Sequence, residues 1–571
     1  MKNIGENAPI SARAAFLLAA VLFVLPAALL FFSSAKLYYP TAQWDGWVLD
    51  SILAIRAGTF ADKPNITHPP LYLYLLAFFK PLFSGGLLEG ARFFNFACYL
   101  LTGWLTFVLS AGLAEKRLAR AAGLIAAALY FTSPLAVQGI FLLDLGDTGI
   151  VPVAAAAYFC LLAYGHGSVS SVAALAAAFA FNLWAKFIHS FFLALSAALL
   201  VVTGEKESRS FAILKALAGG AVLFLATWSI YAFTSLHRPD RWVPLDYFFN
   251  EMLLHYQRHD IGLGIANLFF MRATGFVRVT LWIWPLLVLW AWRVYKRGLG
   301  AGAERSLNYF ILVFMVGAWI SKGTSNGFPK YHAALLPGLC ALCGAYLAEF
   351  LPEIKRAFTP PRAALAAAAL LFLYIAGDPV FTFNYAIKKA LIRGAGVNQE
   401  VGLLVLQLIA APAIMLVFFR ALKLSAGKTA AVALSLAATG VLWQSALYLH
   451  QVRGDYFTNY GYGTTGKAEA VAYLKENFRA GTISGLNEFA WEFRSAGLPF
   501  LELKDVCFIR KECTLAVLQD KGTSFFIFGQ ASNTVEQVRD FLSLEPKTLD
   551  RPFVLVKKGD FWIYDFSEPR K

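Results

Sequence analysis

The chain has 571 residues, of which 58% are hydrophobic and 15% aromatic, and its mean hydropathy is +0.58. This composition excludes an ordinary soluble enzyme and indicates an integral membrane protein. A formal net charge of +15 would suggest a nucleic-acid partner for a soluble protein. Here most basic residues lie in short loops between apolar runs, where membrane topology accounts for them, so we expect no nucleic-acid partner.

Apolar runs of about 17 to 25 residues, long enough to cross a bilayer, recur through the first 449 residues. The first run follows Arg13 but lacks a small-residue cleavage site, so it is interpreted as a retained span and not as a signal peptide. We therefore expect an α-helical polytopic membrane domain over residues 1–449. Its spans, about thirteen, are predicted at 14–32, 92–113, 119–136, 147–164, 170–186, 187–203, 211–235, 276–294, 306–321, 332–350, 363–378, 400–421 and 428–449.

The loops between these runs predict the topology. With a cytoplasmic N-terminus, five of the six inner loops carry Lys or Arg, as the positive-inside rule requires. An odd number of spans then places the C-terminal region outside, together with four polar stretches at 33–70, 137–147, 236–274 and 322–330. The segment 71–83 is too short to span and is bounded by prolines, so we expect a helix lying at the interface.

From about His450 the composition becomes that of a soluble domain. Alternating segments at 525–528, 553–557 and 561–564 predict strands, helical patterns appear at 467–478 and 534–544, and Lys558-Gly559-Asp560 predicts a hairpin turn. We expect a small extracytoplasmic α/β domain over residues 450–571. Cys507 and Cys513 lie in it, and an extracytoplasmic location predicts a disulfide between them. The other cysteines, Cys98, Cys160, Cys340 and Cys343, fall in apolar runs and are expected to be buried thiols.

Acidic residues on the outer side are the first candidates for chemistry. Asp45 stands between Trp44 and Trp47 in the first outer loop, and Asp144 and Asp147 lie in the second. Acids at the edge of a membrane are costly unless they are paired or functional. The structural alternative is a turn at Asp45-Gly46 and a helix cap at Asp144 or Asp147.

Basic residues on the outer side form the second group of candidates. Lys186 lies between two apolar runs, where a lysine either extends to the surface or binds an anion. Basic and aromatic residues also occur in the third and fourth outer loops, and as a set they favour a bound phosphate over contact with lipid head groups. These residues are His255, Arg258, Lys330, Tyr331 and His332.

Several motifs together resemble the GT-C superfamily of polytopic glycosyltransferases. Within it, the closer resemblance is to the branch of the protein O-mannosyltransferases and the lipid A aminoarabinose transferases. The motifs cover about residues 14–350. They are an Asp soon after the first span (Asp45), a Pro-Pro-Leu-x-x-Tyr stretch (69–74), an Asp opening the fourth span (Asp147), a Lys within an apolar pair (Lys186), a Tyr-Phe-Phe-x-Glu stretch (247–251) and a Pro-Lys-Tyr-x-x-x-x-Leu-Pro stretch (329–337).

The resemblance implies a GT-C fold and a transferase that moves a single sugar from a polyprenyl-phosphate donor with inversion. Asp45 would be the general base. Lys186, Arg258, Lys330 and His332 would stabilise the phosphate leaving group, with His68 doing the same or orienting the sugar. Asp147 would hold the acceptor, the sugar or a divalent cation such as Mg²⁺ or Mn²⁺. Asp45 could be a second ligand of that cation.

The acceptor expected from this resemblance is lipid A, another glycolipid, a glycan or a protein. The main alternative is a transporter or flippase of lipid-linked sugars, and within enzymes it is a polysaccharide polymerase or ligase. No repeat of paired broken helices is evident, which disfavours the transporter. We expect a monomer in a bacterial cytoplasmic membrane, with the active site and the C-terminal domain facing the periplasm.

Overall fold

The computed structural model describes the helical bundle, the first outer helices and most of the C-terminal sheet. The residues described are 45–60, 69–79, 86–143, 146, 148–165, 168–204, 207–234, 283–320, 329–351, 409, 412–417, 428–453, 467–485, 489–502, 518, 520–529, 553–558 and 561–569. The predicted spans 14–32 and 363–378, and most of 400–421, lie outside these residues, so the count of thirteen stays a prediction.

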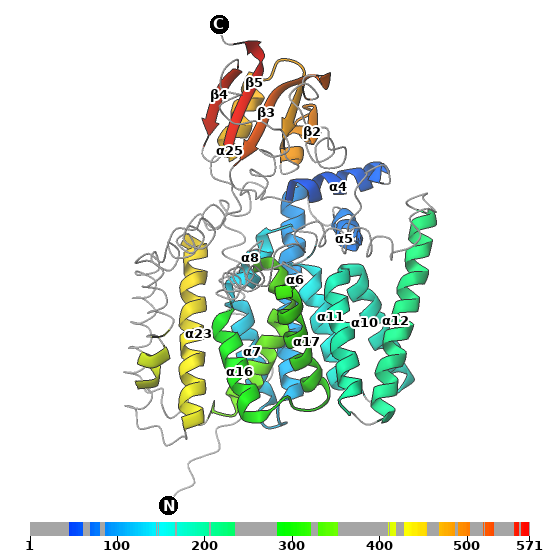
Figure 1. Ribbon diagram of the computed structural model, residues 1–571, viewed down its shortest axis with the longest axis vertical. Helices are drawn as coiled ribbons and strands as arrows, with labels where there is room; N and C mark the ends of the chain where they lie inside the picture. Colours follow the sequence, from blue (N-terminus) through cyan, green and yellow to red (C-terminus); the bar gives the residue numbers. More distant parts are fainter. Residues whose placement is uncertain are drawn as a thin grey trace, which may run out of the picture.

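Apolar helices form the larger part of the molecule and run roughly side by side (Figure 1). Helix α6 lies near the centre and packs against α7, α8, α9 and α18. The helices of this bundle are α6 (Leu87–Leu113), α7 (Ala119–Phe131), α8 (Pro134–Phe141), α9 (Ile150–Tyr164), α10 (Val169–Ala185), α11 (Phe187–Val202), α12 (Glu207–Thr234), α16 (Trp284–Arg297), α17 (Gly302–Ile320), η6 (Pro329–Leu335), α18 (Leu336–Ala348) and α23 (Lys428–Arg453).

Within the described part of the chain, two helices are long and apolar enough to cross a membrane on their own. They are residues 87–113 and 209–234, and five shorter apolar helices accompany them. Helices α7 and α8, counted as one bent span, would make a third. The sequence predicted one continuous span over 119–136, but the two helices meet at an angle of 56°. Pro134 opens α8; it has no N–H to donate and disfavours a helical residue before it, so the first helix ends there.

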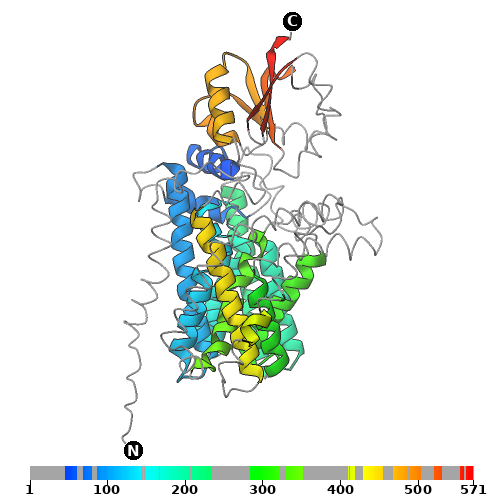
Figure 2. The same cartoon turned by 90° about the vertical axis from the view of Figure 1, so that its left-hand side faces the viewer.

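Two short helices lie across one end of the bundle. Helix α4 spans Asp45–Ala57 and α5 spans Leu71–Phe78, the latter matching the first part of the predicted interfacial helix. They pack against each other, and α5 also packs against α6 and α10. Both views place α4 between the bundle and the C-terminal sheet (Figures 1 and 2).

The C-terminal part contains a five-stranded mixed sheet in the order β2-β1-β3-β5-β4. The strands are β1 (Thr482–Gly485), β2 (Phe500–Glu502), β3 (Thr523–Gly529), β4 (Phe553–Lys558) and β5 (Phe561–Pro569). Helices α25 (Lys467–Asn477) and α26 (Ala490–Arg494) pack with it around a separate apolar cluster. The three predicted strands are therefore present, and β4 and β5 pair antiparallel with Lys558 opposite Phe561, as the predicted hairpin requires. That this part is a separate extracytoplasmic domain from residue 450 stays a prediction.

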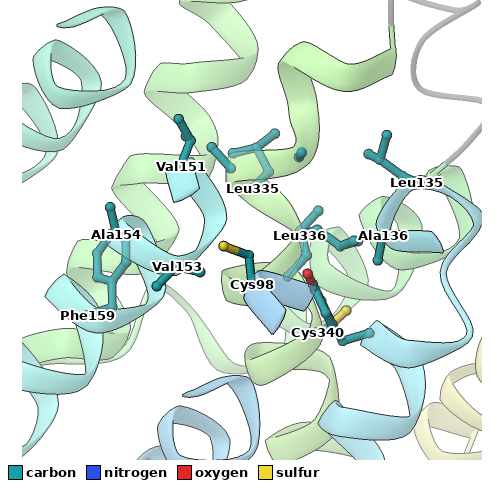
Figure 3. Packing of buried hydrophobic residues seen from close by; sticks show 14 of the residues in the cluster. Cys98, Leu135, Ala136, Val151, Val153, Ala154, Phe159, Leu335, Leu336 and Cys340 are labelled. Carbon is teal, nitrogen blue, oxygen red and sulfur yellow. The ribbon is translucent and has the colours of Figure 1, made fainter. Parts of the chain in front are cut away.

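The main apolar core joins α6, α9, α18 and the start of α8 (Figure 3). Cys98 and Cys340 lie within it (Figure 3), and Cys160 and Cys343 are likewise buried free thiols, as expected. Cys507 and Cys513 lie outside the described residues. The backbones of α18 and α7 approach each other closely at Gly344, since a Cβ added there would lie 2.8 Å from the Ala122 carbonyl oxygen.

Candidate functional site

Helix α4 begins with Asp45 and Gly46 and buries its first eight residues. A carboxylate in the first turn is stabilised by the unpaired N–H groups and the positive end of the helix dipole. The apolar side chains that follow, Val48, Leu49 and Ile52, belong to the main core. Because they fix the helix against the bundle, they carry Asp45 into the interior, where it is only 1% exposed.

The Asp45 carboxylate reaches across the fold to the loop after α8. Its Oδ1 accepts a hydrogen bond of 2.8 Å from the backbone N–H of Leu143, and its Oδ2 lies 3.9 Å from Nη2 of Arg92. Both groups stabilise a negative charge on the carboxylate, the amide directly and the guanidinium at a distance too long for a hydrogen bond. Leu143 immediately precedes Asp144 in the sequence, so the structure joins Asp45 to the segment that carries the other two candidate acids.

Two polar side chains of α6 bind the end of α8 and so place Leu143. Arg92 Nε donates to the Phe141 carbonyl at 3.2 Å, and Asn95 Nδ2 donates to the carbonyls of Gly139 and Leu142 at 3.1 and 2.7 Å. The last carbonyls of a helix have no partner within it, and a buried helix end must find such partners elsewhere. Arg92 and Asn95 supply them from one face of α6, one turn apart.

The Pro-Pro-Leu-x-x-Tyr stretch contributes Tyr72 to the same network. The Tyr72 hydroxyl donates to Asn95 Oδ1 at 2.9 Å. Burial raises the pKa of this phenol well above its ordinary value, and the charge of Asp45 adds to the shift, so Tyr72 remains a protonated donor. Tyr72 also leaves little room for a side chain at position 146 in the segment after α8, because a Cβ there would lie 3.2 Å from the Tyr72 side chain. The φ of Gly146 is +81°, a conformation that favours glycine.

Lys186 stands at the break between α10 and α11. Its backbone is extended, and it is both the C-cap residue of α10 and the N-cap residue of α11. Its side chain is buried. The sequence left two readings open, extension to the surface or binding of an anion. Burial disfavours the first, whereas donor binding by Lys186 stays a prediction.

His332 lies in the 3₁₀ helix η6, which packs against α8 and α9, the helices on either side of the 144–148 segment. It is 1% exposed, and neither ring nitrogen has a hydrogen-bond partner among the described residues. Gln138 on α8 is equally buried, and within the same part of the chain both polar atoms of its amide also lack a partner. Buried polar groups are nearly always satisfied, so two such side chains on contacting elements indicate a place for a polar ligand or water.

The remaining predicted site residues are not described at the level of side chains. Lys330 and Tyr331 lie in η6 beside His332. His68, Asp144, Asp147, His255 and Arg258 lie outside the described residues. The structure thus joins Asp45 to the loop of the second outer acids, and brings η6 against the two helices flanking that loop.

A divalent cation at Asp45 would share its surroundings with Arg92, whose positive charge opposes it. The described part of the chain contains no group of three His, Cys, Asp or Glu side chains that could hold a metal. Asp147, the other predicted ligand, is outside that part, so metal binding stays a prediction.

Comparisons with known proteins place this geometry in context. Residues 67–232 match the family model described as dolichyl-phosphate-mannose-protein mannosyltransferase. The structure of ArnT from Cupriavidus metallidurans bound to undecaprenyl phosphate matches with a TM-score of 0.55 at 14% identity, covering 95% of this chain and 97% of that chain. The apo structure of the same ArnT gives 0.53 at 14% identity, covering 97% and 98%.

The chain has the GT-C fold. The resemblance predicted from the sequence, to GT-C glycosyltransferases that use lipid-linked donors, is thereby confirmed. An oligosaccharyltransferase from Archaeoglobus fulgidus also matches, with a TM-score of 0.44 at 13% identity, over 94% of this chain and 72% of that chain; the fold assignment rests on the two ArnT structures. A search of curated proteins found no match.

Sequence reasoning missed two residues that hold this candidate site together. Arg92 and Asn95 are polar residues three apart within an apolar run, and that spacing was the signal for a shared helix face. Their partners are backbone carbonyls 44 to 49 residues away. No sequence pattern identifies such acceptors, because every residue has one.

Proposed function

We propose that this protein is a membrane glycosyltransferase that moves a single sugar from a polyprenyl-phosphate donor to an acceptor at the outer face of the membrane. The observation that carries the proposal is the buried Asp45 carboxylate, fixed by the Leu143 N–H beside the segment of Asp144 and Asp147. The ArnT whose fold the chain shares was determined with undecaprenyl phosphate bound, which supports a donor of that class.

In the proposed reaction Asp45 acts as general base. Its carboxylate accepts the proton of an acceptor hydroxyl or amine as the acceptor attacks the anomeric carbon. The bond from the anomeric carbon to the phosphate oxygen breaks on the opposite face, so the configuration is inverted. The phosphate leaves as an anion and needs no general acid, and Lys186 with the basic residues of the outer loops stabilises its charge.

The residues of the site divide these tasks. Arg92 and Leu143 orient the carboxylate, and a fixed orientation is what converts a nearby base into an effective one. The unpartnered polar atoms of His332 and Gln138 offer hydrogen bonds to a sugar or an acceptor. Asp144 and Asp147 would hold the acceptor or the sugar.

We place the enzyme in a bacterial cytoplasmic membrane, with the site and the C-terminal region on the periplasmic side. The basic residues of the predicted inner loops support this orientation. The enzyme would then bind its lipid, glycan or protein acceptor at the outer face of the membrane.

The test uses purified full-length protein in lipid vesicles with labelled polyprenyl-phosphate sugars and cell-envelope extracts as acceptor source. The proposal predicts release of free polyprenyl phosphate only when extract is present. Movement of the intact labelled lipid between leaflets, without release for any donor, would instead establish the transporter alternative.

A further inference from the structure

Helix α4 has contacts on both of its sides. On one it packs against α5, and on the other against α26 of the C-terminal part, and in both views it lies between the bundle and the sheet (Figures 1 and 2). Trp491 of α26 packs against the same apolar core that contains Trp47 and Val48 of α4. The C-terminal part is therefore seated directly on the helix that begins with Asp45.

One guanidinium joins the two parts electrostatically. Arg494, at the end of α26, donates from Nη1 to Asp50 of α4 and, at 3.0 Å, to Glu502 of β2. Its Nη2 lies 3.5 Å from the Phe500 carbonyl oxygen. The Asp50 and Glu502 side chains are only 8% and 7% exposed, so without the arginine two buried carboxylates would face each other.

The two anchors of α4 are close together on one rigid element. Asp45 is held by Leu143 and Asp50 by Arg494, and five residues of helix separate them by about 7.5 Å. The apolar contacts of Val48, Leu49 and Ile52 hold α4 on the bundle, and a second polar anchor further limits its rotation and sliding. The planar guanidinium fork is suited to this task because it fixes the direction of each carboxylate that it binds.

We propose that Arg494 is a positioning residue for catalysis, through which the C-terminal sheet fixes α4 and thereby the direction of the Asp45 carboxylate. The inference rests on the proposed role of Asp45 as base. It goes beyond that role, because it gives the C-terminal part a function in the chemical step without contact with the substrates.

The test compares Arg494→Gln with Arg479→Gln in the full-length protein. Arg479 is a matched control, since it belongs to the same part of the chain, is exposed, and donates to backbone carbonyls at Glu476 and Phe478. Two quantities are measured: hydrogen exchange of the α4 amides, and the single-turnover rate of polyprenyl phosphate release at saturating donor.

For Arg494→Gln we expect faster exchange in α4 and a release rate lower by roughly 10-fold to 100-fold, the loss that a displacement of up to 1 Å produces. Donor affinity should stay within about twofold, because Arg494 binds Asp50, Glu502 and the Phe500 carbonyl and is not among the residues proposed to hold the donor. The control should match wild type in both measurements. The double variant Asp50→Arg with Arg494→Asp keeps one arginine between two carboxylates and should recover both α4 protection and rate.

Unchanged α4 exchange in Arg494→Gln would overturn the proposal whatever the activity. So would faster α4 exchange with an unchanged release rate, because Arg494 would then only attach the sheet. If Arg494→Gln does not fold, the charge-swapped double variant decides alone: wild-type exchange and rate support the proposal, and a folded protein with loosened α4 but a wild-type release rate contradicts it. The exchange measurement needs no substrate, so a failure of the proposed glycosyl transfer remains distinguishable from a failure of this inference.

Discussion

At the scale of single residues, Asn95 is a hydrogen-bonding centre of the described site. It accepts from Tyr72 and donates to two carbonyls at the end of α8, so it joins three elements through one amide. Sequence reasoning found Asp45 because an isolated acid beside tryptophans stands out in an apolar chain. It passed over Asn95 because the spacing from Arg92 indicates only a shared helix face and does not identify the carbonyls that the amide binds.

Asn95→Leu should destabilise the protein by about 2–3 kcal/mol, because the Tyr72 hydroxyl loses its acceptor and the Gly139 and Leu142 carbonyls keep only the longer hydrogen bonds from Thr148. Thermal unfolding in detergent measures the loss. Tyr72→Phe is the matched control: it removes one hydrogen bond of the same network and should cost only about 1 kcal/mol. Equal stability of Asn95→Leu and wild type would contradict the network described for the end of α8.

At the scale of elements, most helices of the described part lie where apolar runs predicted them, because a bilayer demands long apolar helices and the sequence must show them. The division between α10 and α11 was predicted at Lys186, because this polar residue lies between two apolar runs. The break between α7 and α8 was not, although Pro134 gave the signal. The end of the span was predicted there from hydropathy alone, and only two polar residues, Thr132 and Ser133, separate the helices.

The contact of α18 with α7 depends on the absence of a side chain at one position. A Cβ at Gly344 would lie 2.6 Å from the Ala126 Cβ and 2.8 Å from the Ala126 nitrogen and the Ala122 oxygen. Backbone atoms cannot rotate away, so Gly344→Ala should destabilise the protein by about 1–3 kcal/mol in detergent unfolding.

Gly219→Ala makes a matched comparison for this change. There the added Cβ would meet only the Ala176 Cβ, at 3.6 Å, which is an ordinary van der Waals contact. It should leave the free energy of unfolding within about 0.5 kcal/mol of wild type. A similar loss for both substitutions would show that close backbone approach is not what makes Gly344 necessary.

At the scale of the whole molecule, the GT-C architecture could be predicted from the order of its motifs along the chain. The seating of α26 on α4 could not, because Asp50 and Arg494 are 444 residues apart and each looks like an ordinary surface charge in the sequence. Their pairing depends on where the sheet docks, which is a tertiary property.

The topology makes a prediction that labelling of intact cells can check. With Cys507 and Cys513 replaced by Ser, Lys475→Cys should react with a membrane-impermeant maleimide, because its exposed site lies in the part predicted to face the periplasm. Arg117→Cys, also at an exposed site, lies in a predicted inner loop and should react only after the membrane is opened. The reverse pattern would invert the orientation.

The account as a whole depends on Asp45 acting as the base. The most direct measurement is the single-turnover rate of polyprenyl phosphate release by wild type and by Asp45→Asn, in lipid and at matched donor occupancy. Asparagine is nearly the same size and shape but cannot accept the proton, so the rate should fall by about 10²-fold to 10⁴-fold, while thermal unfolding shows a folded protein. A folded Asp45→Asn protein that releases polyprenyl phosphate at the wild-type rate would contradict the account.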